Sequence, residues 1–262
     1  VVKGNYIGTD ADGDARVTNK RFGVWLQGET HHNTIGAEAA GNLISGNGYD
    51  GDFPMAGGVA LVGSSSHNLF YNNSIGMTAH GAALPNGGPG VWVSEGSSYN
   101  EFGNWTSPTH ANTIAWNEGD GVLINGTGTL HNTLYRNSIH DNTGLGINNE
   151  SGGNRELVPP QILRYQTLSF GSGSRTVSLH ARTCLTCTVI VYYDDGGEGR
   201  VYEKLVSSLD PNGQFDWNGN IPLYSAVTLV ATDADGNSSE FSASPVELRL
   251  SLDDALPHVV VN

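Results

Sequence analysis

The chain has 262 residues, 36 of them glycine, and a formal net charge of −14. So acidic a chain repels the phosphate backbones of nucleic acids unless it carries a basic stripe, and the sequence contains none, so we expect no nucleic-acid partner. No apolar run approaches the roughly 18 residues that a membrane-spanning helix needs, so we expect no membrane span. Hydrophobic residues nevertheless make up 37% of the chain and recur in order, which indicates a folded protein.

A short apolar motif, Gly-Val-x followed by an aliphatic residue, recurs through the first half of the chain. It occupies residues 23–26, 58–61, 90–93 and 121–124, and a degenerate form starts at Gly146. The leading glycines are 35, 32, 31 and 25 residues apart, a period typical of repeat architectures. Because no Gly-free run of about ten residues shows helical periodicity, we predict an all-β protein.

Two asparagine-led segments follow the Gly-Val motif in each repeat. The first occupies residues 33–35, 68–70, 100–102 and 132–134, and the second 42–44, 73–75, 112–114 and 137–139. Three short strands per repeat, with Gly or Asn at the corners, predict a right-handed parallel β-helix. Its repeats would stack about 4.8 Å apart and bury their inner side chains together.

Alternation along the strands assigns the inner face. The aliphatic positions predicted to point inward and stack are Val24, Val59, Val91, Val122 and Ile147, and Ile44, Ile75, Ile114 and Ile139. The recurrent asparagines share this parity, and a buried asparagine needs hydrogen-bond partners. We therefore predict two asparagine ladders, Asn33, Asn68, Asn100 and Asn132, and Asn42, Asn73, Asn112 and Asn137.

The first 150 or so residues resemble the parallel β-helix repeats of the pectate-lyase-like superfold. The closest resemblance is to large secreted bacterial proteins with repeats of the form G-N-x-I-G-T, G-V-x-I, N-T-I-G, matched here by residues 4–9, 23–26 and 33–36. The resemblance implies a secreted or cell-surface protein, with further coils preceding residue 1. It says little about activity, because this fold supports lyases, hydrolases, epimerases, adhesins and inert fibres.

The repeat ends near Asn149, and a linker leads to a different pattern. Seven strands are predicted near residues 161–170, 175–181, 188–193, 201–207, 214–217, 226–232 and 240–250, separated by Asp-, Gly- and Pro-rich turns. We predict a β-helix over residues 1–154, a small Ig-like β-sandwich over 155–250 and a tail over 251–262. Residues 231–241 resemble the last hairpin of bacterial Ig-like modules, which implies a cap or spacer.

Several side chains are candidates for covalent or metal chemistry. Cys184 and Cys187 are the only cysteines, and we expect a local disulfide, with free thiols as the alternative. Asp10, Asp12 and Asp14 have the spacing of half a calcium loop, but the twelfth position is Arg21 instead of glutamate. A structural calcium ion there is the alternative to an Asx-rich turn, and Asp233, Asp235 and Asn237 repeat the half-motif.

Two rows of outward-facing side chains are candidates for binding. Trp25 and Trp92 lie two repeats apart on the Gly-Val sheet and would form a platform for stacking sugars, unless the loops at 50–56 and 79–89 cover them. His32, His67, Tyr99 and His131 directly precede the first-ladder asparagines and would stack on the outside. Adjacent imidazoles could bind a metal or titrate near pH 6, although polar residues that merely span a turn are the simpler interpretation.

For catalysis the nearest acidic pairs are Asp50 and Asp52, and Glu118 and Asp120, all in corner loops. Neither a polygalacturonase-like nor a pectate-lyase-like residue set occurs in register on one sheet. We therefore expect an extracellular structural or binding module that contacts a polysaccharide, another cell-surface component or further copies of itself. The alternatives are a polysaccharide lyase or glycoside hydrolase, which would use these acidic pairs, and a segment of a phage or virus fibre.

Overall fold

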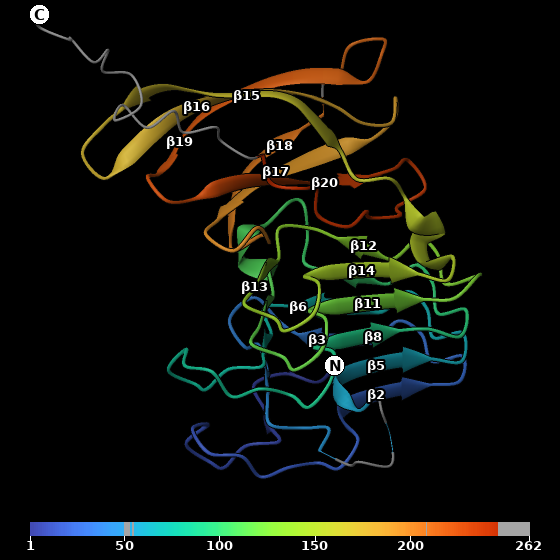
Figure 1. Cartoon of the computed structure of the whole chain (residues 1–262). Helices are drawn as coiled ribbons and strands as arrows, with labels where there is room; N and C mark the ends of the chain where they lie inside the picture. The colour runs from blue at the N-terminus through green and yellow to red at the C-terminus, as the bar shows by residue number, and fades with distance from the viewer. Residues whose placement is uncertain (50–52, 54, 208, 246–262) are drawn as a thin grey trace, which may run out of the picture.

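The computed structural model describes residues 1–49, 53, 55–207 and 209–245. Residues 1–156 contain three parallel sheets and are called the three-sheet region, and residues 161–245 contain two antiparallel sheets and are called the antiparallel region (Figure 1). Among the described residues, the helical segments are the short 3₁₀ turns η1 (Pro108–His110) and η2 (Gly153–Glu156). The all-β prediction is confirmed.

The strands of the three-sheet region are short, as the repeat predicts. The first sheet contains β1 (Tyr6–Ile7), β4 (Leu43–Ile44), β7 (Ser74–Ile75), β10 (Thr113–Ala115) and β13 (Ser138–His140). The second contains β2 (Phe22–Gln27), β5 (Gly57–Val62), β8 (Val91–Val93), β11 (Val122–Asn125) and β14 (Ile147–Glu150), and the third β3 (Thr34–Gly36), β6 (Leu69–Tyr71), β9 (Glu101–Phe102) and β12 (Thr133–Leu134).

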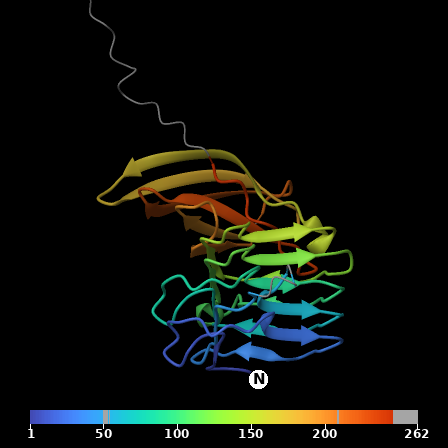
Figure 2. The same ribbon diagram turned by 60° about the horizontal axis from the view of Figure 1, so that its bottom comes forward.

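Each strand in this region pairs in parallel with the strand three places further along the chain. The pairs β1–β4, β2–β5 and β3–β6 begin this pattern, and it continues to β11–β14. The chain therefore visits the three sheets in turn, and the strands of each sheet stack one above another (Figures 1 and 2).

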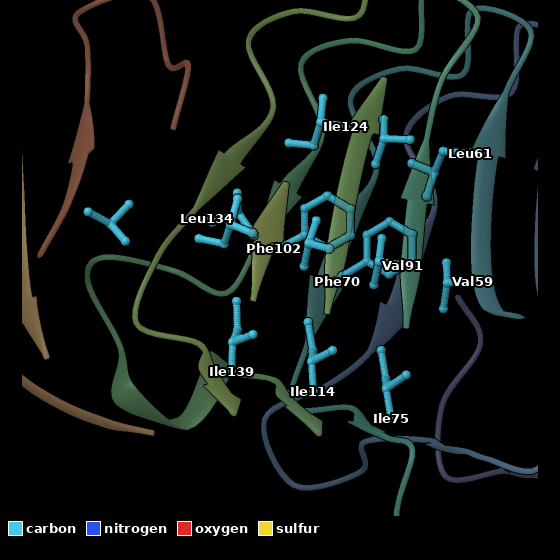
Figure 3. Close-up of a cluster of buried hydrophobic side chains, with 14 of the residues drawn as sticks. Val59, Leu61, Phe70, Ile75, Val91, Phe102, Ile114, Ile124, Leu134 and Ile139 are labelled. Carbon is cyan, nitrogen blue, oxygen red and sulfur yellow. The ribbon is translucent and has the colours of Figure 1, made fainter. Parts of the chain in front are cut away.

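The predicted aliphatic columns are present inside the three sheets. Val59 pairs with Val91 and Val91 with Val122, and all three side chains are fully buried. Figure 3 shows Ile75, Ile114 and Ile139 in a second row, and Phe70 beside Phe102. The ring centroids of these two phenylalanines are 4.7 Å apart. Because each strand is too short to bury its own side chains, the interior forms only when repeats stack.

Buried asparagines connect successive repeats at the corners. Asn68 donates from its backbone N–H and its side-chain amide to Oδ1 of Asn100, at 3.1 and 3.0 Å. The same two bonds recur along both predicted rows, which the structure extends to Asn5 before Asn42 and, by the backbone bond alone, to Asn154 after Asn132. The Asn100 carboxamide, for example, accepts from the backbone N–H of Asn68 in the preceding repeat and donates to Oδ1 of Asn132 in the following one.

A third asparagine row was not predicted. Its members, from Asn19 through Asn47, Asn86 and Asn117 to Asn142, are joined by side-chain bonds of 2.8 to 3.1 Å. Asn47, Asn117 and Asn142 each follow an inward isoleucine by three residues, which is the signal that could have found them. In two repeats an excursion closed by the bridges Thr9–Arg16 and Met77–Ala83 delays the asparagine and hides the period.

The antiparallel region contains two three-stranded sheets. One contains β15 (Gln161–Phe170), β16 (Ser174–Arg182) and β19 (Gln214–Pro222), and the other β17 (Thr188–Asp194), β18 (Val201–Val206) and β20 (Ala226–Thr232). Val177, Leu179, Val189, Val191 and Trp217 belong to the core between them. Five of these strands match the sequence prediction to within one residue at each end, and the sixth, β19, extends five residues beyond the predicted range of 214–217.

The strand predicted over residues 240–250 does not form in its described part, residues 240–245, and the rest lies outside the described residues. Serine side chains explain the difference. The hydroxyls of Ser239 and Ser242 accept from the backbone N–H groups of Ala231 and Leu229, both at 3.0 Å. These hydroxyls occupy acceptor positions that backbone carbonyls fill in a regular β-ladder. Residues 240–245 therefore run beside β20 without forming a strand.

The antiparallel region closes one end of the three-sheet region. Ile190, Tyr192 and Val230 join the hydrophobic cluster that fills the three sheets. Gly199, in the turn between β17 and β18, exchanges two backbone bonds of 2.9 and 3.0 Å with Ile139 of β13. Polar and apolar contacts thus both cover the last repeat, whose strand edges would otherwise be open.

Candidate functional site

Aromatic side chains gather on the outer face of the sheet that contains β2, β5 and β8. The register places Trp25, Ala60 and Trp92 in one outward row. Phe22 lies between the two indoles, with its ring centroid 5.6 Å from Trp25 and 6.0 Å from Trp92. Phe53 packs edge-on against Phe22 at 5.6 Å, so these four rings form one group, called the aromatic cluster.

Only part of the aromatic cluster is open to solvent. Trp25 keeps 41% of its surface exposed, whereas Trp92 is half-buried and Ala60 is fully buried. The Arg21 guanidinium carbon lies 6.0 Å from the Trp25 ring centroid and 5.1 Å from that of Phe53. An exposed indole beside a guanidinium can stack on the C–H face of a sugar ring and donate hydrogen bonds to its oxygens.

The row of His32, His67, Tyr99 and His131 lies on the outside of the corner that precedes the first asparagine ladder. Neighbouring ring centroids are 5.3, 5.1 and 4.4 Å apart and the rings are within 14° of parallel. The faces of these rings therefore cover one another, and mainly their edges reach solvent. Such a row offers little flat surface for stacking a ligand.

Of the two acidic pairs predicted as catalytic candidates, one lies outside the described residues and the other is hydrogen-bonded to protein groups. Asp50 and Asp52 lie outside the described residues. Glu118 accepts a 2.8 Å hydrogen bond from Tyr49, and burial together with this bond raises the pKa of Tyr49 to about 12. Asp120 accepts from the backbone N–H of Leu145 at 2.7 Å and from Asn148 at 3.0 Å. The Glu118 carboxylate thus connects two repeats that lie on either side of a third, and the Asp120 carboxylate connects neighbouring repeats.

The Asp10, Asp12 and Asp14 motif forms a turn. The backbone N–H groups of Ala15 and Asp14 donate to the Asp10 carboxylate and lower its pKa. Asp14 pairs with His80 at 2.9 Å, which raises the pKa of His80. Within the described part of the chain, no group of three or more His, Cys, Asp or Glu side chains is arranged to hold a metal ion.

The side chains of the second half-motif, Asp233, Asp235 and Asn237, also bind protein groups. Asp233 accepts from the amide of Asn237 at 2.9 Å, and Asp235 pairs with Arg155 at 2.7 Å. Cys184 and Cys187 form the predicted disulfide in the turn between β16 and β17.

A cleft of about 650 Å³, which no sequence pattern predicted, lies where the two regions meet. Its walls include Asp141 and Gly146 from the three-sheet region and Glu198, Glu240 and Phe241 from the antiparallel region. Glu198 is largely buried there, and this burial raises its pKa to about 7. No sequence signal marked Glu198, because its partners come from distant parts of the chain.

No protein-family model matches the chain, and neither a curated protein nor a solved structure matches it. None of the described helices has the length and apolarity that a membrane-crossing helix needs.

Proposed function

We propose that this protein is an extracellular structural and binding module, and that it binds polysaccharide at the aromatic cluster. In this proposal the three-sheet region is a right-handed parallel β-helix of the pectate-lyase-like superfold, and the antiparallel region is an Ig-like sandwich. The pairing of each strand with the third strand after it and the asparagine rows support the first assignment. The two packed antiparallel sheets support the second.

The observation that carries the binding proposal is the exposure of Trp25 on β2, the edge strand of a face on which Trp92 is half-buried and Ala60 is buried. Leu123 continues the same outward row and is buried, as is Ala60, whereas Trp25 retains 41% of its surface. Phe22 supports the indole from one side. A rigidly held, exposed aromatic ring loses little conformational entropy when a ligand stacks on it.

A neutral or acidic polysaccharide fits this surface. The C–H face of a pyranose ring packs on an indole, and Arg21 beside it can donate to hydroxyl or carboxylate oxygens. A lyase or hydrolase is less well supported, since Glu118 and Asp120 are engaged in bonds between repeats.

The test is affinity electrophoresis of the protein in gels containing a panel of plant and bacterial polysaccharides. We expect Trp25→Ala to weaken retention by about fivefold or more, because one aromatic stacking contact contributes on the order of 1–3 kcal/mol. Trp105→Ala is the matched control, since Trp105 is 56% exposed but lies outside the aromatic cluster. Retention of this variant should equal that of the unaltered protein.

The proposal fails if no polysaccharide retards the protein, or if Trp25→Ala and Trp105→Ala behave alike. Reducing ends and unsaturated products measured in the same incubations would instead indicate a hydrolase or a lyase. Light scattering on the same sample reports self-association, and a trimer would favour the fibre alternative.

A further inference from the structure

The third asparagine row ends on a carboxylate instead of another asparagine. Asn117 donates its backbone N–H to Oδ1 of Asn142 at 3.2 Å. Asn142, at the last repeat, donates its own backbone N–H to Oε2 of Glu198 at 3.4 Å. Glu198 comes from the turn between β17 and β18, so the antiparallel region supplies the acceptor that a further repeat would provide.

A second glutamate of the antiparallel region accepts a backbone N–H of the last repeat on the neighbouring sheet. Glu240 accepts from the backbone N–H of Asn149 at 2.9 Å through Oε1. Asn237 accepts from the backbone N–H of His131 at 2.7 Å on the third sheet. Ser238 Oγ also accepts from the backbone N–H of Leu134, at 2.9 Å, so four side chains of the antiparallel region take the acceptor positions of a further repeat.

Glu198 differs from Glu240 in its surroundings. Its Oε1 atom is buried without a hydrogen-bond partner among the described residues, and a Cβ on Gly146 would lie 2.9 Å from it. Burial is the main cause that raises the pKa of Glu198 to about 7, and the charges of Asp194 and Asp141 raise it further. The backbone N–H groups of Asn142 and Asp141 act in the opposite direction.

The other charged groups at this contact do not neutralise Glu198. Arg200 pairs with Asp141 at 2.8 Å and lies 3.5 Å from Asp195, so its charge is directed at those two carboxylates. His140 bonds to Asp141 at 2.8 Å. Asp194 is only 3% exposed, and burial raises its pKa, whereas the bond from Asp194 lowers the pKa of Asp195.

We propose that ionisation of Glu198 loosens the contact between the three-sheet region and the antiparallel region, so that the contact is tight in mildly acidic solution and weakens in alkaline solution. Neutral Glu198 still accepts from Asn142 and carries no charge toward Asp141 and Asp194. Ionised Glu198 places another negative charge in a buried site that already faces two carboxylates.

The direction follows from linkage between protonation and docking. A carboxyl group whose pKa is higher in the docked state than in the separated state binds its proton more tightly when docked. The stabilisation is therefore complete below the ordinary pKa of 4.5 and is lost as pH rises through about 7. Between pH 6.0 and 8.5 the equilibrium constant for local opening should rise by about three- to tenfold, after allowance for the partly exposed position of Glu198.

Hydrogen exchange of the full chain, followed by mass spectrometry and corrected for intrinsic rates, tests this inference. The reporters are peptides that contain the amides of Ile139 and Gly199, which exchange bonds across the contact. We expect their protection to fall three- to tenfold between pH 6.0 and 8.5, while peptides of β8 and β11 stay protected. Glu198→Gln retains the acceptor oxygen without the charge and should remove this dependence.

Glu240→Gln is the matched control, because it removes a carboxylate that accepts a backbone N–H at the same contact. This variant should keep the dependence of the unaltered protein. If Glu198→Gln does not fold, Asp194→Asn provides the test, since removing that charge should shift the midpoint to lower pH. The inference is wrong if the unaltered protein shows no pH dependence, if Glu198→Gln retains it, or if Asp194→Asn leaves the midpoint in place.

Discussion

At the scale of single residues, the corners of the repeats impose unusual backbone conformations. His32, His67, Tyr99 and His131 have φ between 53° and 58°, and each directly precedes an asparagine of the first row. Arg136 and Asp141 adopt the same conformation before Asn137 and Asn142. The left-handed residue turns the chain so that the asparagine points inward, so these conformations belong to the architecture and do not mark a functional site.

Two glycines with left-handed backbone conformations differ in whether a side chain at their position would clash with a neighbouring repeat. Gly36 has φ of 93°, and an added Cβ would lie 1.8 Å from the carbonyl oxygen of Tyr71. Gly28 has φ of 61°, and an added Cβ would meet no atom within 4 Å. We expect Gly28→Ala to cost about 1 kcal/mol from the left-handed conformation alone.

Gly36→Ala should lower the free energy of unfolding by on the order of 3 kcal/mol or more, because the two repeats must also separate locally. Urea unfolding followed by circular dichroism measures both variants. Equal losses for the two substitutions would mean that close approach of the repeats does not require Gly36.

At the scale of elements, the asparagine rows join strands that are too short to hold one another by backbone bonds alone. Asn100 is 1% exposed, and its amide donates to Oδ1 of Asn132 at 3.0 Å and to the carbonyl of Ser65 at 3.1 Å. Its Oδ1 accepts both bonds from Asn68. Removing this side chain leaves the buried backbone N–H of Asn68 without an acceptor, and it takes one donor each from the Ser65 carbonyl and from Oδ1 of Asn132.

Asn100→Ala should therefore lower the free energy of unfolding by about 2–4 kcal/mol. Asn33→Ala serves as its control because Asn33 lies in the first repeat of the row, where its amide donates to Asn68 and to the carbonyl of His31. Its replacement should cost under about 1 kcal/mol. Chemical unfolding of both variants checks the difference, and similar values would contradict a cooperative row.

At the scale of the whole molecule, the antiparallel region covers the last repeat in place of a further one. Deleting everything after Leu157 would remove the bonds of Glu198, Asn237 and Glu240 and uncover Ile139. We expect the shortened protein to associate, because open strand edges and exposed aliphatic side chains pair with other chains. Multi-angle light scattering against the full chain measures this, and a monomer of unchanged thermal stability would show that the cap is dispensable.

The sequence by itself determined the repeat and the two aliphatic columns, and it favoured the disulfide that the structure contains. A strand in a stacked repeat alternates its side chains in register with its neighbours, so spacing along the chain is sufficient to place Val59 beneath Val91. Parity likewise placed Trp25 and Trp92 on one outer row, but how much of each ring solvent reaches depends on Phe22 and Phe53.

Only the tertiary structure decided the third asparagine row, the course of residues 240–245 and the state of Glu198. Excursions of variable length hid the row, and serine hydroxyls replaced the expected ladder along β20. The pKa of Glu198 depends on burial and on charges at Asp141 and Asp194, which meet it only after two separately patterned regions pack together. Local periodicity predicts which face of its sheet a side chain occupies. The pKa of a group at a contact between regions depends on its distances to charges far away in the sequence, and spacing along the chain does not encode those distances.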